Sequence, residues 1–162
     1  MAKYVGIDPG SKGSLCCLDT DDLTTVHFMD TPHDSISCTR VRKWLLDWNP
    51  TMIGVENVHS IHLVSAKSNF VFGQNFGIIK GVVGTTMLGT DLVQPKAWQK
   101  ACGITFKPKS APAEKKRIVA ATAQQLYPSA ALHGPRGGLL DGRSDALMIA
   151  HHIMIKYGGQ SG

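Results

Sequence analysis

Apolar and polar residues follow two different periods along the chain, and each period predicts a different kind of element. Five short apolar runs bounded by turn residues are typical of β-strands, and they cover residues 3–8, 14–19, 24–30, 51–57 and 91–95. Four longer stretches are predicted to be helices, and they cover residues 38–49, 65–88, 112–127 and 141–157. This order predicts a single α/β domain over residues 1–162, with a mixed sheet surrounded by helices.

Two of the predicted strands end on an acid. Asp8 closes the first strand, and Glu56 closes the fourth. If these strands are parallel neighbours, both carboxylates lie at the sheet edge where active sites of open α/β sheets form. Asp141 and Asp145 are four residues apart in the last helix, so they share one helix face with Cβ atoms roughly 6 Å apart. Each acid alone also has an ordinary explanation, as a turn residue, a solvated strand end or a helix N-cap.

Several carboxylates that converge without a basic partner repel one another, and divalent cations remove that repulsion. Hard oxygen ligands favour Mg²⁺ or Mn²⁺. Two such ions about 3.5–4 Å apart would activate a water molecule and stabilise the leaving oxygen in phosphodiester hydrolysis. We therefore predict a metal-dependent catalytic site with two ions, formed by Asp8, Glu56, Asp141 and Asp145.

The charge balance indicates an anionic partner. The net charge is +5 and the sequence pI is about 9.1, which favours nucleic acid first and a membrane surface second. One segment is strongly basic against the single acid Glu114, and a solvated charge run is the alternative interpretation. Its basic residues are Lys96, Lys100, Lys107, Lys109, Lys115, Lys116 and Arg117.

Other classes of protein are disfavoured by what the sequence lacks. No apolar stretch reaches the roughly 18 residues that span a bilayer, and the first residues do not resemble a signal peptide. The four cysteines have no metal-binding spacing, and adjacent Cys16 and Cys17 are expected on opposite faces of a strand, reduced and buried. We predict a soluble protein of the cytoplasm with no membrane partner.

A stripe of small residues lies along the long predicted helix. Gly73, Gly77 and Gly81 recur every four residues, so another backbone is expected to come close to this face. Packing against the protein's own sheet is the preferred interpretation, and a partner helix is the alternative.

Several motifs together are similar to those of a known family. VGIDPGSKG, GVEN, FGQNFGIIKG, VQPKAWQK and DGRSDALMIAHH resemble the RuvC family of Holliday-junction resolvases, above all its small branch in phages and prophages. The resemblance spans Lys3 to about His152, with the motifs in the family's order. It implies an RNase H-like fold, a five-stranded mixed sheet with three antiparallel strands first. It also implies a homodimer that resolves four-way DNA junctions by paired nicks with Mg²⁺ or Mn²⁺, in recombination and repair.

The resemblance also assigns roles to individual residues. Asp8 would contact both ions, Glu56 would be the ligand of the second acidic strand, and Asp145 would be the acid of the last helix. The commonest family pattern has a further acid or histidine three residues before the last Asp, where this chain has Gly142. Asp141, one residue earlier, shares a helix face with Asp145 and is the candidate for that role.

Nucleic-acid contacts are implied in three places. The segment 57–70 matches the family's junction-probing loop, with candidate residues His59, Ile61, His62 and Phe70, whereas Phe72 and Phe76 are expected to pack under the long helix. Lys12 and the basic segment would line the DNA path through phosphate contacts. Lys107 or Lys109 would reach the scissile phosphate and stabilise its developing charge.

Three other classes share parts of this pattern. Actin-like sugar kinases begin with a similar acid-tipped hairpin, but they need two such domains, for which 162 residues are too few. A YqgF-like RNA nuclease, or a nuclease of branched or flap DNA, shares the fold and the first acid. A junction-binding protein that has lost its chemistry is the third alternative, against which the clustered acids argue. The sequence does not identify a helicase partner.

Overall fold

The structure of the protein is a computed structural model that describes residues 1–32, 37–59 and 64–159. Two candidates for junction probing, Ile61 and His62, lie outside the described residues. None of the helices in the described part of the chain is both long and apolar enough to cross a membrane.

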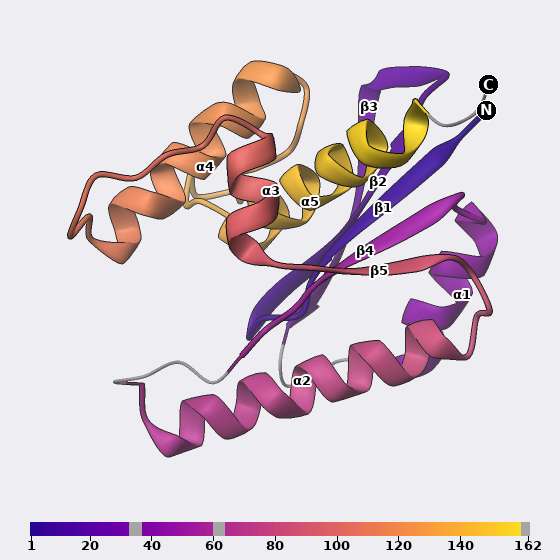
Figure 1. The fold of residues 1–162 in the computed structure, drawn as a ribbon, viewed down its shortest axis with the longest axis horizontal. Coiled ribbons are helices and arrows are strands. Elements are labelled where there is room, and N and C mark those ends of the chain that lie inside the picture. The colour runs from indigo at the N-terminus through magenta and orange to yellow at the C-terminus, as the bar shows by residue number, and fades with distance from the viewer. Residues whose placement is uncertain (33–36, 60–63, 160–162) are drawn as a thin grey trace.

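A five-stranded mixed sheet forms the centre of the molecule (Figure 1). Its strands are β1 (Lys3–Asp8), β2 (Lys12–Asp19), β3 (Asp22–Pro32), β4 (Met52–Glu56) and β5 (Thr90–Val93), in the spatial order β3-β2-β1-β4-β5. The first three strands pair antiparallel, whereas β4 lies parallel to β1 and β5 parallel to β4. This arrangement confirms the predicted sheet and makes the strands that end on Asp8 and Glu56 parallel neighbours.

Helices cover both faces of the sheet (Figure 1). One layer consists of α1 (Cys38–Trp48) and α2 (Ala66–Gly84). The other consists of α5 (Asp141–Gly158), which lies along β1 and β2, with α3 (Pro95–Ala101) and α4 (Pro112–Leu126) beside it. Each layer therefore has its own core.

The alternation of side chains along the central strands divides the core in two. Tyr4 and Cys16 pack under α5, whereas Val5 and Cys17 pack under α1 and α2, and all four are at most 1% exposed. Because a strand alternates its side chains between faces, Cys16 and Cys17 lie on opposite sides as predicted. Both are buried free thiols.

Two helices differ from the sequence prediction. Residues 95–101 form α3, which the sequence does not predict. Pro95 occupies its first turn, where no intrahelical N–H bond is lost, and Trp98 is buried. The long helix α2 ends at Gly84 rather than at 88, and Met87 has a positive φ of 60° in the turn that follows.

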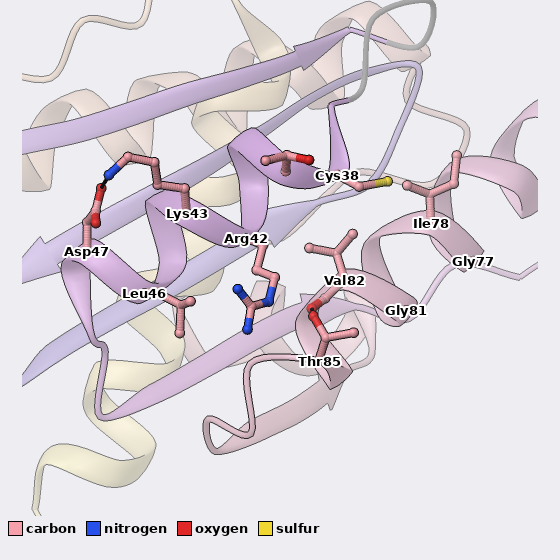
Figure 2. A pocket seen from close by; sticks show the side chains of 11 residues that line it. Cys38, Arg42, Lys43, Leu46, Asp47, Gly77, Ile78, Gly81, Val82 and Thr85 are labelled. Carbon is pink, nitrogen blue, oxygen red and sulfur yellow. Dashed lines mark hydrogen bonds and ion pairs between the residues drawn. The ribbon is translucent and has the colours of Figure 1, made fainter.

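The glycine stripe of α2 does not pack against the sheet, so the preferred interpretation is wrong. A Cβ atom added at Gly73, Gly77 or Gly81 would meet no described atom within 4 Å, and all three glycines are exposed. Gly77 and Gly81 instead line a groove between α1 and α2, of about 680 Å³ (Figure 2). The sheet is covered by a different side of α2, through Ile79 and Val83.

Candidate active site

The strand register places a row of polar side chains across one face of the sheet. Ile7 of β1 pairs with Val55 of β4, so the next residues, Asp8 and Glu56, are neighbours at the strand ends. Asp8 also lies directly opposite Ser14 of β2, and Ser14 lies opposite Asp30 of β3. Because directly opposed residues point to the same side of a sheet, Glu56, Asp8, Ser14 and Asp30 form one row. This polar row is on the α5 face.

Helix α5 lies so close to this face that glycine is required beneath it. A Cβ atom at Gly6, two residues before Asp8, would lie 2.1 Å from the carbonyl oxygen of Ala146, and one at Gly54 would lie 2.4 Å from Ile153 Cγ1. The close approach carries Asp141 and Asp145, in the first turns of α5, toward the strand ends. The charge of Asp141 raises the pKa of Asp8, and the charge of Asp8 raises the pKa of Asp145. The four predicted acids are therefore close together at one edge of the sheet.

Burial and mutual repulsion dominate the electrostatics of this cluster. Asp8 is only 9% exposed, and burial, followed by the charge of Glu56, raises its pKa to about 8. Burial also raises the pKa of Asp145 well above its usual range, with further contributions from the charges of Asp8 and Glu56. Burial raises the pKa of Glu56 as well. At neutral pH the free site therefore has a strong affinity for positive charge, as protons or as a cation.

Three of the four acids have protein partners. Asp8 Oδ1 accepts a hydrogen bond of 2.8 Å from the backbone N–H of Gly10. Glu56 Oε1 accepts one of 3.0 Å from Nε1 of the buried Trp98 on α3. Asp141 forms an ion pair with Lys116 of α4. In the described part of the chain, no three acidic, His or Cys side chains converge closely enough to hold a metal ion as they stand.

The chemistry of the donor set nevertheless fits a divalent cation. The acids supply only carboxylate oxygens, which are hard ligands suited to Mg²⁺ or Mn²⁺. The positive charge of Lys116 only partly opposes their repulsion: it lowers the pKa of Asp8 and of Asp145, and in both cases burial and the neighbouring carboxylates outweigh it. Asp8 and Asp145 are the acids whose pKa is most strongly raised, so they gain most from a bound cation.

Packing accounts for a glycine, rather than an acid or histidine, at position 142. A Cβ atom there would lie 1.9 Å from the backbone carbonyl oxygen of Lys12, the first residue of β2. No acid or histidine fits at this position. Asp141, one residue earlier, is the nearest position in α5 from which a carboxylate is available.

The basic segment lies beside the acids. Its seven basic side chains are all exposed, and α3 and α4 both contact the acids, through Trp98 and Lys116. A cavity of about 120 Å³ between these helices is lined by Glu56, Asp145 and Lys115, among others. Lys12 is also exposed and lines a second cavity that includes Asp141.

The candidates for junction probing are only partly described. Phe70 is 73% exposed at the start of α2, and His59 is exposed with its Nε2 3.3 Å from Oε1 of Gln94. Phe76 packs against the core beneath α2, as predicted, and Phe72 is half-buried. The role of His59 and Phe70 in DNA binding stays a prediction.

Sequence reasoning missed two features of the site. Trp98 orients Glu56, and its signal was available, because a buried indole N–H requires an acceptor. Arg143 lies between the two acids of α5 in sequence, yet its guanidinium binds Asp30, 113 residues away. No local pattern indicates that pairing.

Comparisons with known proteins identify the fold. No family model matches the chain, and no curated protein does. Among solved structures, it is similar to RuvC of Thermus thermophilus in complex with a Holliday junction substrate, with a TM-score of 0.66 and 16% identity over 100% of this chain and 98% of that one. RuvC from the same organism in another structure gives a TM-score of 0.61 at 16% identity, covering 98% and 96% of the two chains. The Fowlpox virus resolvase, in complex with substrate Holliday junction DNA, gives 0.57 at 15% identity, covering 95% and 97%. The chain therefore has the RNase H-like fold of RuvC-type resolvases.

Proposed function

We propose that this protein is a structure-selective DNA endonuclease that resolves four-way junctions by paired nicks, with Mg²⁺ or Mn²⁺ as cofactor. The observation that supports the proposal most directly is the gathering of Asp8, Glu56, Asp141 and Asp145 at one sheet edge, next to exposed basic residues, in a RuvC-like fold. An inert binder would gain nothing from buried acids beside DNA phosphates.

Each residue of the site would have a distinct task. Two bound ions would supply Lewis-acid activation of water and stabilisation of the leaving oxygen. Asp8 would hold them from the centre of the sheet, with Glu56 oriented by Trp98 and Asp145 presented from α5. Lys116 holds Asp141 in the free protein and offers an ammonium group to the incoming phosphate. The other basic residues of α3, α4 and their connection would bind the DNA backbone.

A homodimer would supply the second active site that paired nicks require. The exposed glycine stripe of α2 supports this part of the proposal, because small residues let a second helix approach closely. Figure 2 shows that the groove beside the stripe has Leu46 of α1 on one side and Val82 of α2 on the other. Leu46 is exposed, and a helix from a second copy would cover it.

The test is cleavage of a synthetic four-way junction in Mg²⁺ or Mn²⁺ by the wild type and by Asp8→Asn, with linear duplex, a Y-fork and an RNA hairpin as controls. We expect symmetric paired nicks from the wild type, and binding without cleavage from Asp8→Asn. Cleavage of forks or RNA alone would contradict the junction substrate. Binding without cleavage in either metal would support the inert junction-binding alternative.

A further inference from the structure

Arg143 lies in the motif DGRSD between two acids of the site, a position where a cation would be expected to contact either those acids or DNA phosphate. Its partners in the structure lie elsewhere. Its Nε and Nη2 donate to the two carboxylate oxygens of Asp30, at 2.8 and 2.7 Å, and its Nη1 donates to the backbone carbonyl of Ala131 at 2.9 Å. All three guanidinium nitrogens are therefore bound within the protein.

Asp30 belongs to the polar row that contains Asp8. Ser14 stands between them, fully buried, and its hydroxyl donates to Asp30 Oδ1 at 3.2 Å. Arg143 also stacks over the ring of Phe28, with 5.2 Å between the guanidinium carbon and the ring centroid. The guanidinium thus connects the first turn of α5 to β3, which is the edge strand on the opposite side of β1 from β4.

Apart from the ion pair of Asp141 with Lys116 of α4, the first turn of α5 is not held by a side-chain cap. Its N-cap residue is Leu140, whose side chain accepts no hydrogen bond. Gly142 lies against the carbonyl of Lys12, which limits how close this turn comes to the start of β2. A bidentate Arg–carboxylate pair fixes both distance and orientation. The side chains of Arg143 and Asp30 are 23% and 44% exposed, and a pair this exposed adds little to global stability.

We infer that Arg143 and Asp30 form a positioning pair, which fixes the rotation of the first turn of α5 over the sheet so that Asp141 and Asp145 face Asp8. This inference rests on the proposed function and adds to it two residues that touch neither DNA nor metal. Neighbours that hold ligating carboxylates in place commonly affect metal affinity and activity strongly.

The experiment compares Arg143→Ala, Asp30→Asn and the double variant with Lys156→Ala. The control variant removes a similar surface pair from the other end of the same helix, Lys156–Asp91 at 2.7 Å. Three quantities are measured on the full chain: the Kd for Mn²⁺ by calorimetry, the Kd for a four-way junction in EDTA, and the single-turnover cleavage rate. Thermal melts report folding.

We expect each single variant to raise the Kd for Mn²⁺ and to lower the cleavage rate by about 10- to 100-fold, with junction affinity changed by less than about twofold. The double variant should be no worse than either single variant, because one interaction is lost in all three. Lys156→Ala should match the wild type in metal binding and cleavage. Should Arg143→Ala fail to fold, Arg143→Lys, which keeps the charge but loses the two-point contact, should give a smaller loss in the same two quantities.

Two results would overturn the inference while leaving the proposed function intact. One is wild-type metal binding and cleavage by Arg143→Ala. The other is weaker junction binding by Arg143→Ala but not by Asp30→Asn, which would make Arg143 a phosphate contact. A wild type that neither binds Mn²⁺ nor cleaves the junction would overturn the proposed function, and the positioning role with it.

Discussion

The glycines on the two sides of the sheet have opposite surroundings. Under α5, Gly6 and Gly54 have no room for a methyl group, since a Cβ atom would fall 2.1 and 2.4 Å from atoms of the helix. On α2, at Gly73, Gly77 and Gly81, a Cβ atom would meet no described atom within 4 Å. The first group serves the contact between α5 and the sheet that brings the acids together. The second leaves a surface on which another chain has room to pack.

The difference teaches how the same residue type serves folding in one place and association in another. Beneath α5, the stability lost by placing glycine in a strand is compensated within the same chain, because the helix backbone packs closely against it. On α2, exposed glycines lower the stability of the helix, and no contact in the described chain compensates for this loss. Four substitutions follow, from the largest expected effect to the smallest. Three test this contrast directly, and the third in order tests the burial of an acid that the contact between α5 and the sheet encloses.

Gly6→Ala should have the largest effect. The new methyl group would lie 2.1 Å from the carbonyl oxygen of Ala146 and 2.3 Å from the backbone nitrogen of Ala150, and neither backbone atom is free to move alone. We expect a loss of at least about 3 kcal/mol in the free energy of unfolding, measured by urea denaturation. A loss below about 1 kcal/mol, typical of ordinary sites, would mean that α5 is not held against β1 as described.

Gly77→Glu should leave the protomer folded and weaken dimerisation. In an isologous dimer through the stripe, two unpaired carboxylates would be buried, at a cost of at least about 3 kcal/mol, which corresponds to a dimer Kd raised roughly 100-fold. Analytical ultracentrifugation measures the Kd, and circular dichroism checks the fold. The paired nicks should become independent single nicks. Dimerisation at the wild-type Kd would place the interface elsewhere.

Asp8→Asn should stabilise the protein in EDTA at alkaline pH. Because the pKa of Asp8 is raised to about 8, the folded state holds a proton that the unfolded state releases near pH 4. The free energy of unfolding therefore falls as pH rises from about 4 to about 8, and asparagine removes that contribution. We expect the two proteins to be equally stable near pH 4 and the variant to become progressively more stable than the wild type as pH rises toward 8. Equal stability of both proteins at every pH would contradict the burial of the Asp8 charge.

Gly73→Ala should have the smallest effect, and of the opposite sign to Gly6→Ala. The methyl group meets no described atom, and alanine is the better helix former, so we expect a gain of about 0.5–1 kcal/mol. The measurement is thermal unfolding at a protein concentration low enough to keep the protomer monomeric. A destabilised variant would mean that this face of α2 packs within the chain, as the sequence first suggested.

Much of the fold could be predicted because its signals are local. The runs that end on Asp8 and Glu56 are apolar between turn residues, and they became β1 and β4 almost to the residue. The spacing of Val41, Leu45 and their neighbours predicted α1 in the same way. Helix α3 was missed because seven residues, two of them lysines, offer too short a pattern beside a strongly basic background.

The sequence predicted which acids form the candidate site, but it did not predict the residues that hold these acids in place. Strand ends and a helical spacing of four are properties of neighbouring residues, so the sequence by itself placed Asp8 and Glu56 at strand ends and put Asp141 and Asp145 on one helix face. Their convergence required β1 and β4 to be parallel neighbours, which the tertiary structure decided. The direction of the glycine stripe, the exclusion of a side chain at Gly142 and the pairs Lys116–Asp141 and Arg143–Asp30 were decided by the tertiary structure. These depend on the approach of segments far apart in sequence, and neither periodicity nor composition records which distant backbone or charge will lie within contact distance.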